Sequence, residues 1–179
     1  AYTVLDEALA QLDCFALLRD NTADDAEQHP HLVHVVEGRY EPPAPYPVWV
    51  NIALLIATVF SVLMVGLTIA VGHIAQTDPA LADRIALGGL AELWRGWPYA
   101  FSILLILGSH EMAHYAMIRR HGIAGTLPYF IPAFMISPFG TFGAAIMLRG
   151  PIRDRRALFD LGASGPLAGL FFAVPILII

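Results

Sequence analysis

Three long apolar stretches dominate the chain after residue 47. From Val48 to Ala75 the only ionisable side chain is His73, a second stretch runs from Pro98 to Ile118, and a third begins near Ala157 and continues to Ile179. A helix of about 20 apolar residues crosses the hydrocarbon core of a bilayer. The pattern therefore predicts an α-helical multi-pass membrane protein with three transmembrane helices in this sequence.

A fourth apolar segment, Thr126–Leu148, has the length of a membrane span but not its composition. Its 23 residues carry no charge, yet they include three prolines and two glycines. Proline and glycine inside a helix destabilise it, so a continuous helix is not expected here. We expect a re-entrant segment, an irregular loop followed by a short strand or hairpin around Phe139–Met147. Such backbone survives at membrane depth only when it is buried in protein or lines a cavity. A plain packing loop is the alternative.

Residues 1–47 differ from the rest in being polar and acidic, with nine acidic side chains against two arginines. Apolar positions at roughly helical spacing predict an amphipathic helix from about Thr3 to Arg19. Loose alternation over His31–Tyr40 favours a strand, and four prolines within residues 41–47 indicate an extended linker. We therefore expect an N-terminal extension, residues 1–47, before a membrane-embedded core, residues 48–179.

Composition agrees with a membrane protein and excludes other classes. Hydrophobic residues make up 57% of the chain and charged residues 14%, and the mean hydropathy is +0.63, which is too apolar for a soluble domain of this length. There is no basic tract or nucleic-acid motif, so nucleic acid is not an expected partner. The single cysteine, Cys14, excludes an intrachain disulfide and a cysteine-rich zinc site.

The second apolar stretch contains His110-Glu111-Met112-Ala113-His114, a HExxH sequence. Two histidines four residues apart on a helix point the same way, so both can reach one metal ion while the glutamate faces the same pocket. From Pro98 to Ile118, apart from tyrosine, these three side chains are the only ionisable ones. Ionisable groups at membrane depth are costly and usually functional. The motif therefore indicates a metal site, although a short sequence of this kind can also occur by chance.

Arginines predict how the spans are oriented. Six of them lie between the second and third apolar stretches: Arg119, Arg120, Arg149, Arg153, Arg155 and Arg156. Residues 76–97 carry two arginines balanced by three acids. Positive charge in short loops marks the cytoplasmic side of a membrane protein. We expect residues 119–156, and by parity the N-terminal extension, on the cytoplasmic or stromal side, with the predicted active site toward that face.

Several motifs in one order resemble the site-2 protease family of intramembrane zinc metalloproteases. They are the HExxH sequence in an apolar helix, Leu127–Pro132, Gly140–Ala144 and Ala163–Gly169. The resemblance covers residues 98–179, and the N-terminal extension is similar to that of the branch with plant plastid members. It implies that His110 and His114 bind Zn²⁺, that Glu111 is the catalytic base, and that substrates are transmembrane helices of other proteins.

The third zinc ligand of that family is an Asp followed by Gly on a later transmembrane helix, and no Asp-Gly pair occurs in these 179 residues. Asp160, near the start of the third apolar stretch, is the weak substitute within the chain. We expect the third ligand on sequence that this chain lacks, and a core that is incomplete at its C-terminus.

Two further predictions concern partners. An exposed strand edge at Gly140, Thr141, Phe142, Gly143 and Ala144 would let an extended peptide add as an extra strand beside the metal, so these residues are predicted to bind substrate. Gly165 and Gly169 form a GxxxG pair that permits close contact with the second span. The predicted function is intramembrane zinc-dependent proteolysis in contact with membrane lipid. A metal or proton transporter and a non-cleaving pseudoprotease, both using the same His and Glu residues, are the alternatives.

Overall fold

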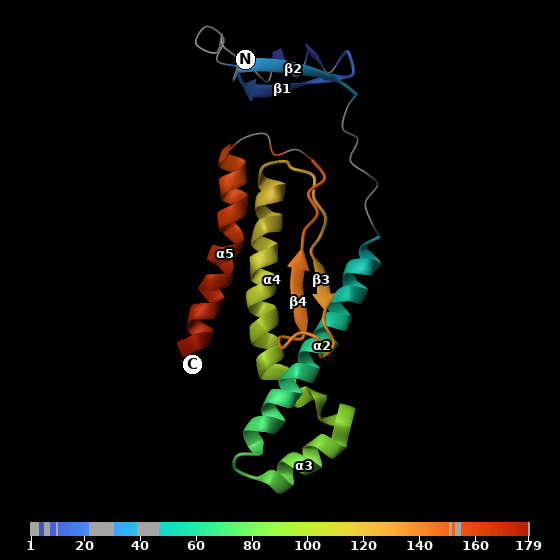
Figure 1. The fold of residues 1–179 in the computed structure, drawn as a ribbon, viewed down its shortest axis with the longest axis vertical. Coiled ribbons are helices and arrows are strands. Elements are labelled where there is room, and N and C mark those ends of the chain that lie inside the picture. Colours follow the sequence, from blue (N-terminus) through green and yellow to red (C-terminus); the bar gives the residue numbers. More distant parts are fainter. Residues whose placement is uncertain are drawn as a thin grey trace. The chain divides into compact units, whose positions relative to one another are not determined.

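The computed structural model describes residues 4–5, 8–9, 11–21, 31–38, 47–150, 152 and 155–178 (Figure 1). The chain divides into two compact units, Ala1–Pro42 and Pro43–Ile179. The division falls in the proline-rich stretch of the sequence.

The first unit contains an antiparallel hairpin of β1 (Cys14–Asp20) and β2 (His31–Glu37), paired from Cys14 opposite Glu37 to Asp20 opposite His31. The strand predicted within residues 31–40 is confirmed. The helix predicted over residues 3–19 is wrong from Cys14 onward, although residues 4–5 and 8–9 are helical. Its apolar spacing fits a helix, but pairing with a strand 11 or more residues away decides the conformation, and local periodicity does not report such pairing.

The second unit is mainly helical. Its helices are α2 (Val48–Ile74), α3 (Pro79–Gly88), the 3-10 helix η1 (Gly89–Gly96), α4 (Trp97–Arg120) and α5 (Arg155–Ile178). Among the described residues, three helical segments are long and apolar enough to cross a membrane: Val48–Ile74, Pro79–Arg120 and Arg155–Ile178. The three predicted apolar helices are therefore confirmed as helices. The second is continuous with α3 and η1, which fill the stretch between α2 and α4.

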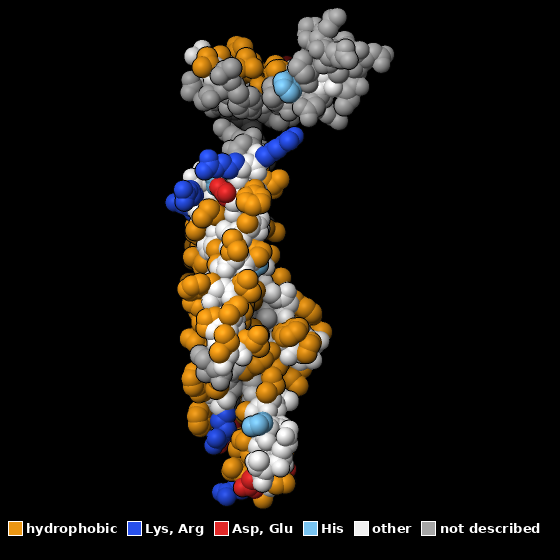
Figure 2. All heavy atoms as spheres, turned by 90° about the vertical axis from the view of Figure 1, so that its left-hand side faces the viewer, with side chains coloured by type: hydrophobic (Ala, Val, Ile, Leu, Met, Phe, Trp, Pro, Cys, Tyr) orange, Lys and Arg blue, Asp and Glu red, His pale blue; other side chains and the backbone are white. Residues whose placement is uncertain are grey.

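The surface of the second unit has the distribution that a membrane would require. Large apolar side chains on the helices point outward, with Leu177 88% exposed and Phe159 73% exposed. Figure 2 shows hydrophobic side chains covering the flank of the helices and charged side chains gathered toward the two ends of this unit. Monomeric soluble proteins rarely expose contiguous apolar surface of this kind.

Helix α4 lies between two different neighbours. Helix α5 packs along one side of it, and a second hairpin, β3 (Tyr129–Pro132) and β4 (Thr141–Ala145), lies on the other side (Figure 1). The hairpin is antiparallel, with Phe130 opposite Ala144, and its strand β3 packs against α2. The strand predicted within residues 139–147 is confirmed as β4, but its hairpin partner β3 lies in the stretch that was predicted to be an irregular loop. The order α5, α4, hairpin, α2 places α4, with the HExxH sequence, against both α5 and the hairpin.

Helix α2 holds the hairpin in position through close contacts. The Asn51 side-chain amide donates hydrogen bonds to the carbonyls of Leu127 and Pro128, at 3.2 and 3.1 Å, just before β3. At the other end of the hairpin, Gly140 has φ +76°, and a Cβ there would lie 2.8 Å from the Cα of Val62 on α2. Only glycine allows that backbone conformation and that approach together.

Candidate metal and substrate site

The two histidines of the HExxH sequence lie on one flank of α4 with their rings together. The Nε2 atoms of His110 and His114 are 3.0 Å apart, and the ring centroids are 4.7 Å apart. Two nitrogens bound to one tetrahedral zinc ion at about 2.0–2.1 Å lie about 3.3 Å from each other. The observed separation therefore fits two imidazoles that share one metal ion.

A carbonyl on α5 fixes the tautomer of His114. The Nδ1 atom lies 2.7 Å from the carbonyl oxygen of Leu161. A carbonyl oxygen only accepts hydrogen bonds, so Nδ1 carries the proton, and in the neutral imidazole Nε2 then carries the lone pair. Metal-binding histidines commonly donate their other ring N–H in this way. The Nε2 atom of His114 is thus prepared to bind a metal.

The space beside the histidines depends on the two glycines of the GxxxG pair. A Cβ on Gly165 would lie 2.2 Å from Nε2 of His114, and a Cβ on Gly169 would lie 3.4 Å from Nδ1 of His110. Both glycines are buried. The predicted close contact of this pair with the second apolar helix is confirmed. The missing side chain at Gly165 makes room for the His114 ring, which an alanine at residue 165 would displace.

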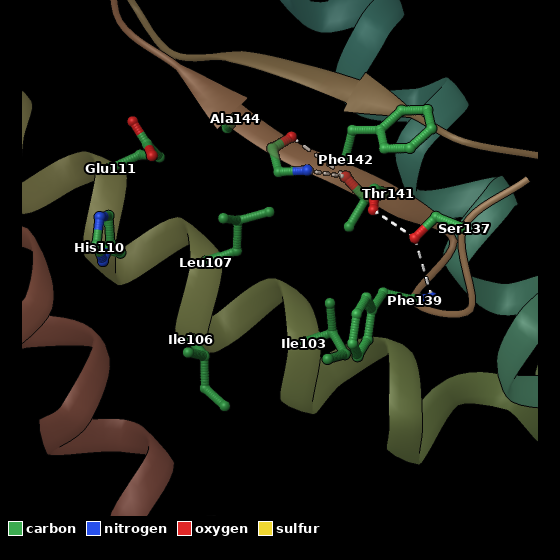
Figure 3. A pocket seen from close by; sticks show the side chains of 11 residues that line it. Ile103, Ile106, Leu107, His110, Glu111, Ser137, Phe139, Thr141, Phe142 and Ala144 are labelled. Atoms are coloured by element: carbon green, nitrogen blue, oxygen red, sulfur yellow. Dashed lines mark hydrogen bonds between the residues drawn. The ribbon is translucent and has the colours of Figure 1, made fainter.

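Glu111 faces a cavity of about 590 Å³ between α4 and the hairpin. The residue is only 7% exposed, and among the described residues its carboxylate has no hydrogen-bond partner. Figure 3 shows His110 and Glu111 at one end of the cavity and Ser137 and Phe139 at the other. The lining is mainly apolar and comes from Ile103, Ile106, Leu107, His110, Glu111, Ser137, Phe139, Thr141, Phe142, Gly143 and Ala144.

Strand β4 and the turn before it form the wall opposite α4, and their polar side chains form hydrogen bonds within that wall. The Thr141 hydroxyl donates to the carbonyl of Ile131 at 2.8 Å and accepts from the backbone N–H of Gly143 at 3.0 Å. The Ser137 hydroxyl donates to the Thr141 carbonyl and accepts from the N–H of Phe139 (Figure 3). These bonds stiffen the β4 wall without occupying the cavity.

Four of the five predicted substrate-binding residues line the cavity: Thr141, Phe142, Gly143 and Ala144. Gly140 instead lies against α2. Among the described strands, β4 pairs only with β3, so its other edge has no strand partner. The sequence does not predict that Ile103, Ser137 and Phe139 line the cavity. They belong to no motif, and only the fold of the chain brings them there.

No group of three or more His, Cys, Asp or Glu side chains that could hold a metal gathers among the described residues. Asp160, considered from sequence as a substitute third ligand, instead lies 3.0 Å from Nε2 of His121 through its Oδ2 atom. The residues present therefore fit two zinc ligands and a neighbouring carboxylate.

Comparison with curated proteins identifies relatives of the chain. It is 29% identical over 140 residues to the probable chloroplastic zinc metalloprotease EGY1 of Oryza sativa subsp. japonica, covering 71% of this chain and 23% of that protein. It is 36% identical over 93 residues to the probable chloroplastic zinc metalloprotease EGY2 of Arabidopsis thaliana, covering 51% and 16%. The chain is similar to chloroplastic zinc metalloproteases that belong to the site-2 protease family.

The match to these plastid site-2 proteases is partial in length. The chain spans at most about a quarter of the curated relatives, including 25% of EGY1 from Arabidopsis thaliana, to which it is 26% identical over 145 residues. No family model matches the chain, and no solved structure matches it. The resemblance noted from the motifs is confirmed, and its relatives are named zinc metalloproteases.

Proposed function

We propose that this chain is part of an intramembrane zinc metalloprotease that hydrolyses peptide bonds within or near the transmembrane helices of substrate proteins. The observation that carries the proposal is the pair of Nε2 atoms of His110 and His114, 3.0 Å apart, where His110 and the buried Glu111 line one cavity. The names of the relatives support zinc and proteolysis. Regulated intramembrane proteolysis is the biological setting that we propose for this activity.

The apolar helices support placing this site within a membrane. We propose that α2, α4 and α5 each cross the bilayer, with residues 119–125 on the cytoplasmic or stromal side. His114 lies six residues before Arg120, or about 9 Å along the helix. The metal ligands would then lie below the membrane surface on that side, and plastid relatives make a plastid membrane the natural setting.

Zinc held by His110 and His114 would polarise a substrate carbonyl and make a water molecule more acidic. Glu111 would accept the proton of the attacking water and return it to the leaving amine. Its carboxylate is suited to this role because none of the described residues hydrogen-bonds to it. The walls of the cavity around it are mainly apolar.

The hairpin supports a mode of substrate binding. A helical substrate hides its peptide bonds, so it must unwind locally before hydrolysis. We infer that the unwound segment lies along the free edge of β4, at Thr141–Ala144, and presents an extended backbone to the cavity, because strand addition satisfies main-chain hydrogen bonds that membrane lipid cannot.

The test is cleavage of a model transmembrane substrate by the full-length protein that contains this chain, compared with Glu111→Gln in the same membranes. The variant should retain zinc and lose at least about 1,000-fold in cleavage, since it cannot accept the proton. Glu37→Gln, on exposed β2, is the control and should cleave normally. If the wild type binds zinc but cuts nothing, proteolysis is wrong. Metal flux would then favour a transporter, and unchanged substrate capture would favour a pseudoprotease.

A further inference from the structure

Two polar contacts join α4 and α5 next to the metal site. In the first, Nδ1 of His114 donates to the carbonyl of Leu161 at 2.7 Å. In the second, Nε2 of His121 lies 3.0 Å from Oδ2 of Asp160. His121 directly follows α4 and is seven residues after His114, which is about two helical turns and therefore about the same side of the helix. On α5 the two partners are consecutive residues.

Asp160 and Leu161 are adjacent on α5, yet their partners are seven residues apart. The reason is that a helical side chain and a helical carbonyl point in opposite directions along the helix. In a helix, side chains tilt toward the N-terminus and carbonyls point toward the C-terminus. Helix α5 runs back alongside α4 (Figure 1). The Asp160 side chain therefore reaches toward the end of α4, where His121 lies, and the Leu161 carbonyl points back toward His114. Asp160 and Leu161 of α5 thus contact two different histidines that are about two helical turns apart.

The sequence of α5 is adapted to this contact. Pro166 lacks an N–H and cannot donate to the carbonyl of Gly162, which loosens the helix in the turn that follows Leu161. The Leu161 carbonyl also accepts a hydrogen bond from the Ser164 hydroxyl at 3.0 Å. Gly165 allows the His114 ring to approach, since a Cβ there would lie 2.2 Å from Nε2. A small sliding of α5 would therefore break the bond to His114 or force its ring against the helix.

We propose that Asp160 and His121 form a positioning pair, which holds α5 in the register where the Leu161 carbonyl keeps the proton of His114 on Nδ1 and leaves Nε2 free for metal. The proposal rests on the proposed role of His114 as a zinc ligand. Neither Asp160 nor His121 contacts the metal or substrate in this scheme. Together they decide which nitrogen of His114 can bind metal.

The first measurement follows the tautomer of His114 in the metal-free, full-length protein, through imidazole ¹⁵N chemical shifts assigned with a His114→Gln variant. The wild type should show His114 protonated on Nδ1. Asp160→Ala should shift a substantial part of the population to the Nε2-protonated form. Asp160→Asn should preserve the wild-type tautomer, because its side-chain carbonyl still accepts a hydrogen bond from His121. Asp83→Ala, an exposed acid on α3, is the matched control.

The second measurement is zinc affinity by chelator competition. Asp160→Ala and His121→Ala should each weaken zinc binding about 10–100-fold, as loss of an outer-shell partner typically does. The double variant should be no weaker than either single one, because both remove the same contact. A folded Asp160→Ala protein that keeps both the wild-type tautomer and the wild-type zinc affinity would overturn the proposal. Losses of zinc affinity that simply add in the double variant would overturn it too.

The outcomes also separate this proposal from the proposed function. Substrate cleavage is not needed for either measurement. If zinc binds and responds to Asp160→Ala while no substrate is cut, the positioning pair stands and proteolysis fails. If His114 is protonated on Nε2 in the wild type, the positioning pair fails whatever the protein cleaves.

Discussion

The absence of a side chain at Gly165 provides the space that the His114 imidazole occupies. A Cβ at residue 165 would lie 2.2 Å from Nε2, 2.5 Å from Cε1 and 2.7 Å from Cδ2 of that ring, so the whole ring would have to move. Gly162, one turn earlier on α5, has nothing within 4 Å of its Cβ position. The two glycines therefore form a matched pair for testing how closely the helices must approach.

Gly165→Ala should weaken zinc binding about 10-fold or more, because displacement of the ring misaligns Nε2 and breaks the bond to Leu161. Gly162→Ala should leave zinc affinity unchanged. Chelator competition measures both, and circular dichroism checks that the helices persist. Equal affinities in the two variants would show that the site tolerates a wider separation of α4 and α5 than the structure indicates.

At the residue scale, sequence could predict His110, Glu111 and His114 because helical periodicity alone decides which positions share a face. Their catalytic roles remain predictions. The Leu161 carbonyl could not be predicted, because every residue has a carbonyl and only the packing of α5 selects this one. The pairing of Asp160 with His121 could not be predicted either, because the two residues are 39 positions apart and only the packing of α5 brings them together.

At the scale of elements, Asn51 links α2 to the hairpin, and its loss should loosen the hairpin without touching the metal ligands. Asn51→Ala removes two donors and leaves the carbonyls of Leu127 and Pro128 without them. Unsatisfied buried carbonyls cost about 1–3 kcal/mol. Hydrogen exchange of backbone amides in residues 126–132 should therefore become roughly 10–100-fold faster, while zinc affinity stays at the wild-type value.

Thr68→Val is a suitable control for that experiment. Thr68 lies on the same helix, but its exposed hydroxyl bonds only to the Met64 carbonyl of α2 itself. The control should leave exchange in the hairpin unchanged. Unchanged exchange in Asn51→Ala as well would mean that the close approach of Gly140 to α2 is sufficient to hold the hairpin.

The hairpin near α2 and the hairpin of the first unit were not equally predictable. Prolines and glycines within residues 126–148 exclude a continuous helix, so composition alone indicated irregular or extended backbone there. Residues 14–20 contain neither residue type, and their apolar spacing suits a helix as well as a strand. Their conformation is decided by pairing with residues 31–37, a nonlocal interaction that a local pattern cannot report.

At the scale of the whole molecule, the arginine distribution predicts which ends of the helices share one side of the membrane. Arg119 and Arg120 end α4, and Arg155 and Arg156 begin α5. Residues 75–96, which join α2 to α4, carry two arginines and three acidic residues, so they lack the excess of positive charge that marks the cytoplasmic side. If α2 and α4 both span the bilayer, residue 14 and residue 124 lie on the arginine-rich side, and residue 76 lies on the other.

Labelling with a membrane-impermeant maleimide in sealed vesicles of known orientation tests this arrangement. Cys14 is the single cysteine of these 179 residues, so it reports the first position once any cysteine elsewhere in the full-length protein is replaced by serine. In a Cys14→Ser background, Ala124→Cys and Gln76→Cys report the other two, and both residues are exposed. Vesicles that present the cytoplasmic or stromal side outward should label Cys14 and Ala124→Cys but not Gln76→Cys, and inverted vesicles should give the reverse. Labelling of residues 76 and 124 from the same side would mean that α4 does not cross the bilayer, and His110 and His114 would then belong to a site at the membrane surface rather than within it.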